Sequence, residues 1–567
     1  MMTRSLLTLS LIALLGGCAT NTSTTATTGV AHVAIFGIND FHGNIQATAP
    51  TPRMVDLPDS DHPDKKIAVP TGGIAYLASE LKALRQANPH SITVGLGDLI
   101  GGSPVTSSLL DDEPTIEALN QIDLAISVVG NHEFDNGRAA LEQRIKGVCP
   151  ATGCKLAGFK GARFTYLAAN VLDRNSGKPF LTPYVIREID GVKIGFVGTP
   201  LHDVPTMVMA AGIQSLRFAD EVETINALVP EIKAKGAATI IALVHQGADF
   251  TGPFNDPTYK CDGLTGPIID LTKRLDPAVK VVMSAHTHNA YTCKIDGRLL
   301  TQGYNYGALV STVRLDIDRA SGEVISADAT NQLVDQRSLT PDPQLQQFVD
   351  KVAATTTVIR NQPVGQTTQQ LTRKAADNYG DSALGNLVAD AQLAYAKRFG
   401  KADIAFTNSG GLRAELPSTA VAAEGKTLTY GDLYAVQPFR NSLVVMTLSG
   451  KQILSLLRNQ WPAADAGKPG LLQISGNLHY RWSPQRPVTD RVIDVTVDGK
   501  PLDPARDYRV AINAFLAGGG DGAATFKDGS DTIALPGLDV DALRWYVEDR
   551  RKVDDYRSEG RIQKTLQ

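Results

Sequence analysis

The sequence predicts an α/β protein, and three observations lead to this prediction. Short apolar runs rich in β-branched residues alternate with segments whose apolar residues recur at helical spacing. Asp, Asn or His follows several of these runs almost at once, as expected where strands of an α/β sheet end at a ligand site. The chain of 567 residues is 43% hydrophobic and 20% charged, which is enough apolar material for buried sheets.

The N-terminus resembles an export signal. Arg4 precedes an apolar run over residues 6–15, which is too short to cross a bilayer and is typical of a secretory signal. The run ends in Leu-Gly-Gly-Cys at residues 15–18, which resembles the lipobox of bacterial lipoproteins. This resemblance implies removal of a signal peptide spanning residues 1–17 and acylation of Cys18, whose several acyl chains would anchor the protein to a membrane. An ordinary signal peptide that happens to contain a cysteine is the alternative.

The predicted address is the cell envelope, as a lipoprotein facing the periplasm. Residues 18–30 are rich in Ser, Thr and Ala and predict a flexible tether. Ala19 stands where Asp often signals retention in the inner membrane, so we expect the outer membrane. Four cysteines remain, an even number in an exported chain, which predicts disulfides. Of the three possible pairings we prefer the local one, Cys149–Cys154 and Cys261–Cys293.

The first half contains five predicted strands that end at groups able to bind a metal ion. These strands cover residues 33–38, 91–96, 125–129, 239–244 and 279–284. A sixth strand is predicted at 192–198, and helices are predicted at 72–87, after residue 136, at 218–235 and at 267–275. The groups at the strand ends are Asp40, His42, Asp98, Asn131, His245, His286 and His288.

Seven groups are too many for one metal ion. Two ions that share a bridging carboxylate would use them all, and Asp98 is the candidate bridge. In such centres the ions lie roughly 3.5–4 Å apart. Mixed imidazole, carboxylate and amide ligation favours Mn, Fe, Co or Zn over Mg or Ca. A single histidine at a strand end is usually structural, but the recurrence at five strand ends argues against that interpretation.

The segment 130–135 carries the candidate catalytic pair. His132 offers an imidazole to the substrate, and Asp135 can fix its tautomer and stabilise its protonated form. A helix N-cap beside an exposed histidine is the alternative interpretation of this segment taken alone.

These motifs resemble those of the calcineurin-like metallophosphoesterases. The resemblance rests on Asp-Phe-His-Gly at 40–43, Gly-Asp at 97–98, Gly-Asn-His-Glu at 130–133, His245 and His-Thr-His at 286–288. Beyond the tether, the whole chain resembles the bacterial 5′-nucleotidase family, which includes periplasmic UDP-sugar hydrolases. The resemblance implies a four-layer α/β/β/α catalytic domain over residues 31–340, a linking helix at 341–365 and a C-terminal α/β substrate-binding domain at 366–567.

The same resemblance assigns roles to individual residues. One metal would be held by Asp40, His42, Asp98 and His288, and the other by Asp98, Asn131, His245 and His286, with His132 and Asp135 as the catalytic dyad. In the second half it implies base stacking by Phe439 and Phe515, substrate binding by Asn408 and Arg413, and a ribose contact by Asp521. Relatives often carry two arginines before the helix that begins near residue 381. Only Arg373 is a candidate here, so we expect the substrate phosphate to be bound more weakly or by a different arrangement of residues.

The predicted function is that of an exported phosphohydrolase with two divalent metal ions that releases phosphate from nucleoside 5′-monophosphates. UDP-sugar hydrolysis is a further activity that the resemblance implies. We expect a monomer whose partners are its nucleotide substrate and, through the lipid anchor on Cys18, the membrane. A net charge of -4 is not typical of proteins that bind polyanions, so we expect no nucleic-acid partner. A 2′,3′-cyclic-nucleotide 2′-phosphodiesterase/3′-nucleotidase or a thiosulfohydrolase on the same scaffold is a rival enzyme, and a non-catalytic nucleotide-capture lipoprotein is a rival of another class.

Overall fold

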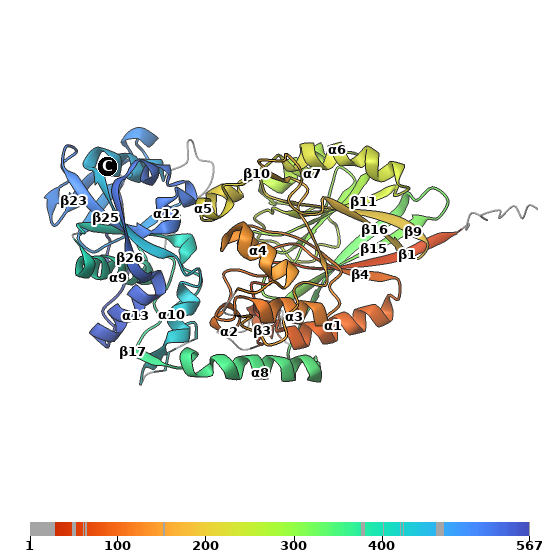
Figure 1. The fold of residues 1–567 in the computed structure, drawn as a ribbon, viewed down its shortest axis with the longest axis horizontal. Coiled ribbons are helices and arrows are strands. Elements are labelled where there is room, and N and C mark those ends of the chain that lie inside the picture. The colour runs from red at the N-terminus through yellow and green to blue at the C-terminus, as the bar shows by residue number, and fades with distance from the viewer. Residues whose placement is uncertain are drawn as a thin grey trace, which may run out of the picture.

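The computed structural model forms two lobes, and Figure 1 shows them side by side with helix α8 along one edge. The structure describes residues 29–47, 53–59, 62, 65–150, 153–375, 380–400, 402–419, 421–422, 424–460 and 470–565. The predicted signal peptide and lipidated Cys18, and all of the tether except residues 29 and 30, lie outside the described residues. Among the described residues, no helix is both long and apolar enough to cross a membrane.

The first lobe is built on two six-stranded sheets. In spatial order the first contains β16 (Val324–Leu333), β15 (Leu309–Asp318), β1 (Val30–Ile38), β4 (Ser91–Gly95), β5 (Ile126–Val128) and β6 (Thr165–Leu167). The second contains β13 (Tyr291–Ile295), β14 (Arg298–Gln302), β12 (Val279–Ser284), β11 (Thr239–His245), β9 (Val192–Pro200) and β8 (Tyr184–Ile189). The strands that were expected to carry ligands run parallel at the centres of these sheets.

The two sheets pack face to face, and helices cover both outer faces. Ile35 and Val94 of the first sheet share one buried apolar cluster with Phe196, Leu243 and Val281 of the second. Separate clusters join each outer face to its helices. These helices are α1 (Ile74–Ala87), α3 (Glu113–Gln121) and α4 (Gly137–Lys146) on one side, and α6 (Glu221–Ala234) and α7 (Pro267–Arg274) on the other. The four-layer α/β/β/α prediction is therefore confirmed.

Local sequence explains where several helices begin. The side chain of Asp220 accepts a hydrogen bond from the backbone N–H of Glu223 at the start of α6, and Ser382 caps α9 (Ala383–Phe399) through the N–H of Gly385. The predicted linking helix is shorter than expected. Helix α8 spans Pro343–Arg360, and residues after Pro363 pair instead with another strand, as β17 (Pro363–Thr367) against β19 (Lys426–Thr429).

The second lobe contains a mixed five-stranded sheet. Its order is β21 (Leu472–Ile474), β18 (Ile404–Asn408), β25 (Asp507–Asn513), β20 (Ser442–Ser449) and β26 (Ser530–Leu538). Helices α9 and α13 (Asp539–Arg550) pack on one face, and α11 (Gly450–Asn459) packs on the other beside a small four-stranded sheet. Phe515 lies in the short helix α12 (Ala514–Ala517), where the side chain of Asn513 accepts a hydrogen bond from the backbone N–H of Leu516.

The two lobes are docked through an apolar contact. Val105 of the short helix α2 (Val105–Ser108) is buried in a cluster that otherwise belongs to the second lobe and includes Tyr434 of α10 (Tyr430–Val436). The hydroxyl of Ser108 is hydrogen-bonded to that of Tyr434. Arg440 adds an ion pair of 3.5 Å with Asp111. Buried apolar side chains, a hydrogen bond and an ion pair therefore hold the two lobes together.

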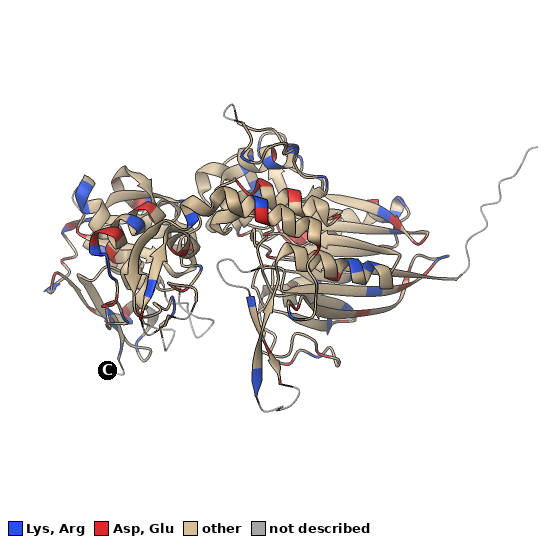
Figure 2. Ribbon diagram, turned by 90° about the horizontal axis from the view of Figure 1, so that it is seen from below, with Lys and Arg blue, Asp and Glu red and all other residues tan. Residues whose placement is uncertain are grey.

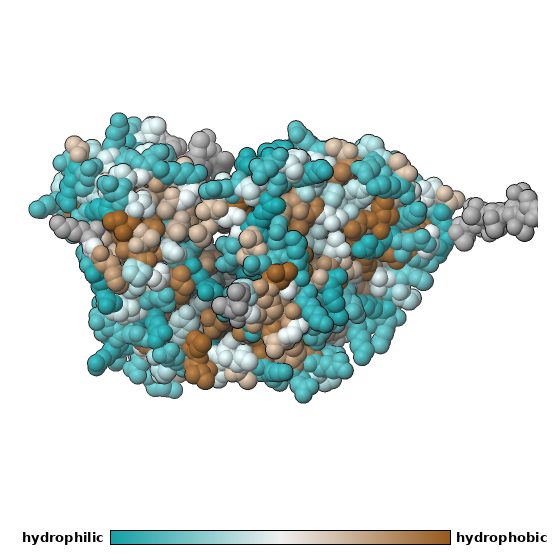
Figure 3. Space-filling view, in the orientation of Figure 1, coloured by the Kyte–Doolittle hydropathy of each residue, from teal (hydrophilic) through white to brown (hydrophobic). Residues whose placement is uncertain are grey.

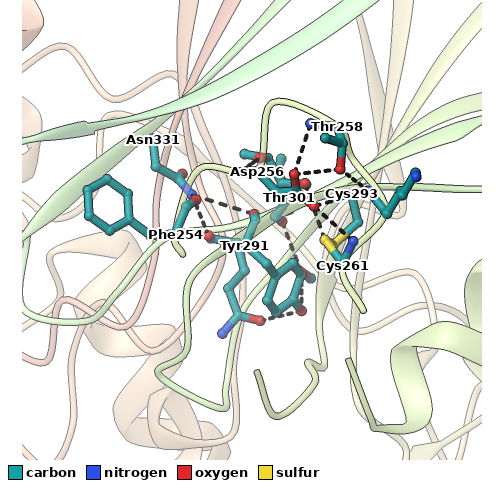
Figure 4. Close-up of a disulfide and its surroundings, with 12 residues drawn as sticks. Phe254, Asp256, Thr258, Cys261, Tyr291, Cys293, Thr301 and Asn331 are labelled. Atoms are coloured by element: carbon teal, nitrogen blue, oxygen red, sulfur yellow. Dashed lines mark hydrogen bonds between the residues drawn. A yellow bond between two sulfur atoms is a disulfide. The ribbon is translucent and has the colours of Figure 1, made fainter. Parts of the chain in front are cut away.

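Both predicted disulfides are present. Cys149 and Cys154 are joined with 4.9 Å between their Cα atoms, and Cys261 and Cys293 with 5.7 Å. Figure 4 shows the second bond tying the loop before α7 to β13, where Asp256 accepts a hydrogen bond from the backbone N–H of Cys261.

Acidic and basic residues are intermixed over both lobes (Figure 2), and apolar surface is divided into small patches on the face shown in Figure 3.

Candidate metal centre and active site

The structure brings all seven predicted metal-binding groups together at one edge of the first lobe. Each group lies at or just beyond the carboxyl end of β1, β4, β5, β11 or β12. Because parallel strands end at the same edge of a sheet, and the two sheets are stacked, groups up to 248 positions apart in sequence converge.

The groups form two clusters that meet at Asp98. Possible ligand atoms of Asp40, His42 and His288 lie within 4.8 Å of one another, and so do those of Asp98, His245 and His286. Oδ2 of Asp98 lies 3.1 Å from Nε2 of His245 and 3.8 Å from Nε2 of His42, so one carboxylate oxygen faces both clusters. Asn131 joins the second cluster, with its Oδ1 3.1 Å from Nδ1 of His286.

Most of these ligands have a strained backbone. Asp40, His42, Asp98, His286 and His288 have φ values between 46° and 78°, in the left-handed region that non-glycine residues rarely adopt. Each such residue costs on the order of 1–3 kcal/mol, and strain of this kind collects at functional sites. The fold therefore holds the ligands in place at a local energetic cost.

The donor set fits cations. Nδ1 of His245 is bonded to the carbonyl of Leu96 at 2.7 Å, and Nδ1 of His42 to the carbonyl of Gly101 at 2.8 Å. If these nitrogens carry the protons, lone pairs remain on Nε2, and in His245 that nitrogen has no hydrogen-bond partner among the described residues. Nε2 of His42 faces Nε2 of His288 at 3.2 Å. A separation of this size suits two imidazole ligands of one metal ion.

The pKa values of the ligand histidines are shifted in both directions. Burial lowers the pKa of His42 and of His286 to about 3, so both imidazoles are neutral and able to bind metal. Burial also lowers the pKa of His245, but the carboxylate of Asp98 raises it more, to about 9. Without a metal ion, His245 therefore carries a proton on both ring nitrogens near neutral pH. A metal ion bound at Nε2 would displace the proton on that nitrogen.

Several residues that were not predicted support the ligands. Asn39 donates from Nδ2 to Oδ2 of Asp40 at 2.6 Å, and Nδ2 of Asn305 lies 2.9 Å from Nδ1 of His288. Glu133 is fully buried and accepts from the backbone N–H groups of Asp98 (2.8 Å), Leu99 (2.9 Å) and Gly130 (2.6 Å). It thereby ties the loop after β4 to the loop after β5. The position of Glu133 in the Gly-Asn-His-Glu motif at 130–133 was the sequence feature that could have indicated this role.

The predicted dyad is in contact. Nδ1 of His132 lies 2.9 Å from Oδ1 and 3.0 Å from Oδ2 of Asp135. Burial lowers the pKa of His132, but Asp135 and Asp98 raise it more, so the net shift is upward. The backbone N–H of His132 also donates to Oδ1 of Asp98 at 2.8 Å, which links the dyad to the metal centre.

A cavity of about 250 Å³ connects this centre to the second lobe. One end is lined by Asn131, His132, Asp135 and His286, and the other by Asn408, Arg413, Phe439, Phe515 and Asp521. Phe439 stacks on His132, with 5.3 Å between ring centroids and 10° between planes. Nδ2 of Asn408 donates to Oδ2 of Asp521 at 2.7 Å. The structure thus brings five of the six predicted substrate residues into one space.

Arg373 is the sixth and lies elsewhere. It lines a neighbouring cavity, and its Nη1 donates to the carbonyls of Leu412 (3.1 Å) and Arg413 (3.2 Å). Arg373 therefore holds the loop that carries Arg413. The cavity also has lining that sequence patterns did not indicate, namely Asn441 and residues 207–209 of the first lobe.

Two stacked sheets with a shared cluster of metal ligands, facing a substrate cavity, define a metal-dependent phosphoesterase. Residues 33–290 match the model of the calcineurin-like phosphoesterases, and residues 363–528 match the 5′-nucleotidase C-terminal domain. The chain belongs to the 5′-nucleotidase family and is a metal-dependent phosphoric monoester hydrolase.

Relatives and solved structures agree with this assignment. The chain is 32% identical to the cell wall protein Lmo0130 of Listeria monocytogenes, over 96% of this chain and 70% of the relative. It is 30% identical to the endonuclease YhcR of Bacillus subtilis over 93% of this chain, although it spans only 40% of that relative. It is 25% identical to the 2′,3′-cyclic-nucleotide 2′-phosphodiesterase/3′-nucleotidase of Yersinia enterocolitica, over 96% and 89%. The crystal structure of a 5′-nucleotidase precursor from Thermus thermophilus superposes with a TM-score of 0.74 at 25% identity, covering 95% of this chain and all of the other.

Proposed function

We propose that this protein releases phosphate from nucleoside 5′-monophosphates, with two divalent metal ions of the Mn, Zn, Co or Fe type. One observation carries the proposal. A single cavity has the candidate dyad and metal ligands at one end and two phenylalanines with an Asn–Asp pair at the other. The aromatic faces suit a base, the Asn–Asp pair suits a ribose, and the ligand cluster suits a phosphate.

The two clusters support a division of the metal ligands between two ions. Asp40, His42, Asp98 and His288 would hold one ion, and Asp98, Asn131, His245 and His286 the other. Bound there, the ions would supply Lewis acidity that polarises the phosphoryl oxygens and lowers the pKa of water.

The remaining residues act on the substrate directly. His132, oriented by Asp135, donates a proton or a hydrogen bond where negative charge grows on the phosphoryl group or the leaving oxygen. Arg413 lies with its guanidinium carbon 5.6 Å from the ring centroid of Phe439 and can pair with the phosphate. Phe439 and Phe515 stack the base, and Asp521 accepts from a ribose hydroxyl.

The domain division and the address are part of the proposal. We assign residues 31–340 to catalysis, 341–365 to a linker and 366–567 to nucleotide binding. The lipobox-like segment and the two disulfides support an exported lipoprotein in the cell envelope, and one relative is itself named a cell wall protein.

A substrate panel tests the proposal. The purified protein, loaded with Mn²⁺, is given AMP, 3′-AMP, 2′,3′-cyclic AMP and UDP-glucose, and release of phosphate, 3′-AMP or UMP is measured. We expect AMP to have the highest kcat/KM, and EDTA to abolish activity until Mn²⁺ is returned. Preference for the cyclic nucleotide would support the activity named for the Yersinia relative. Tight nucleotide binding without hydrolysis would support a capture protein.

A further inference from the structure

One wall of the nucleotide cavity comes from a part of the first lobe that no assigned role involves. The chain between β9 and β10 (Leu216–Phe218) forms a one-turn 3₁₀ helix, Val204–Thr206, and the short helix α5 (Ala210–Ile213). Between them, Met207, Val208 and Met209 line the cavity together with Phe439 and Phe515. Their side chains carry no acid, base or metal-type ligand, so any role must come from apolar contact.

This segment is fixed against the catalytic dyad. Gly212 of α5 packs directly on Gly137, which begins α4 two residues after Asp135. A Cβ built on Gly212 would lie 2.7 Å from Cα of Gly137, and Gly137 has φ of +79°, so neither glycine can carry a side chain without a shift of the backbone. Val204 and Ile213 are buried in the core of the first lobe and anchor the two ends of the segment. The methionines therefore sit on a rigid support.

The same segment reaches the second lobe. Its 3₁₀ turn contacts the turn Gly520–Gly522, which carries Asp521. Figure 1 shows α5, in yellow, at the junction of the lobes. The side chain of Met209 is 37% exposed. Removing this apolar surface from water would be favourable. A ligand in the cavity would provide that burial.

We propose that Met207 and Met209 form a nucleobase-binding wall, by which the catalytic lobe contacts the planar heterocycle held by the second lobe. The inference rests on the proposed nucleotidase function for its substrate, and adds first-lobe residues that bind the base. A thioether is polarisable and has several rotamers, so it makes favourable contacts with aromatic rings, typically with sulfur about 5 Å from the ring, and adapts to rings of different size. The base would contact both lobes, with the phenylalanines on one side and the methionines on the other, whereas a small aryl phosphate has no such group and gains little from this wall.

The test compares paired variants on three ligands. In the full-length protein, Met207→Ala/Met209→Ala removes the wall, Met207→Leu/Met209→Leu keeps an apolar wall of similar volume, and Met54→Ala is the matched control. Met54 is an exposed methionine (47%) on the hairpin strand β2 (Arg53–Pro58) and lines neither this cavity nor its neighbour. The measurements are KM and kcat for AMP and for p-nitrophenyl phosphate with Mn²⁺, and the Kd of adenosine for the metal-free protein by calorimetry.

We expect the alanine pair to raise the KM for AMP and the Kd for adenosine at least fivefold, with kcat/KM for p-nitrophenyl phosphate within twofold of wild type. Met54→Ala is expected to stay within twofold for all three ligands, and the leucine pair, which keeps the apolar volume but loses the thioethers, is expected to raise both constants less than the alanine pair does. An unchanged AMP KM and adenosine Kd in the alanine pair, or equal loss on both substrates, would overturn the proposal, as would wild-type protein that binds no adenosine. A wild type that binds adenosine through these methionines but hydrolyses no phosphate ester would refute the nucleotidase function and leave this inference standing.

Discussion

Replacement of His132 by alanine tests the candidate dyad most directly. The imidazole lies against both oxygens of Asp135, and its loss leaves that carboxylate without its partner beside the reacting phosphate. A positioned acid or base contributes about 10²–10⁴ in rate, which corresponds to about 3–5 kcal/mol of transition-state stabilisation. We therefore expect kcat for AMP to fall by two to four decades.

The structure also predicts what does not change. The backbone N–H of residue 132, not its side chain, donates to Oδ1 of Asp98, and alanine keeps that donor. The metal content of His132→Ala, measured by elemental analysis after loading with Mn²⁺, should therefore equal that of wild type. If His132 protonates the leaving oxygen, the loss should be smaller for p-nitrophenyl phosphate, whose leaving group needs no proton.

Two outcomes would refute this reasoning. Activity within tenfold of wild type would show that the dyad does not act in the reaction. Loss of about one metal equivalent would show that His132 is a ligand, an arrangement that its proximity to His42 and Asp98 also permits.

Three other predictions concern binding and stability. Phe439→Ala should raise the KM for AMP about 5- to 150-fold, since a base–aromatic stack is worth about 1–3 kcal/mol, but should leave p-nitrophenyl phosphate hydrolysis nearly intact; equal losses would make Phe439 a packing residue. Removal of the Cys261–Cys293 bond by paired alanines should lower Tm more than removal of Cys149–Cys154, because it closes a loop of 32 rather than 5 positions, and the reverse order would contradict this loop-entropy argument. Burial raises the pKa of Asp539 in the folded protein to about 7, so this carboxyl binds a proton more tightly in the folded than in the unfolded state. The stability that this bound proton contributes to the folded protein is lost as pH rises from about 4 to 7. Asp539→Asn should therefore raise Tm by several degrees at pH 8 but not at pH 4, and an equal effect at both pH values would count against a charge effect.

The sequence predicted much of the site because its signals were local. Ligand-type residues directly after apolar β-branched runs indicated strand ends, and parallel strands place those ends at one edge. Asp40, Asp98, Asn131 and His286 therefore converge as expected. The helix that begins after Ser382 was likewise visible from its capping residue.

Other features depended on contacts between distant segments. Arg373 was expected at the phosphate, yet it bonds the carbonyls of Leu412 and Arg413, which no spacing in the sequence indicates. Glu133 was part of a recognised motif, but only the packing of two loops showed that its carboxylate joins them.

The sequence by itself determined the fold class and the identity of the metal-type ligands, because backbone periodicity and strand-end chemistry are properties of short segments. It predicted disulfides from the number of cysteines, and the tertiary structure decided among the three possible pairings. Only the tertiary structure showed that Met207 and Met209 line the cavity beside the predicted substrate residues. In the sequence Met207 and Met209 cannot be told from ordinary core residues. The base-binding role proposed for them depends on the position of the second lobe across the cavity. Apolar contact is non-directional and has no motif, so its partners become visible only when the chain is folded.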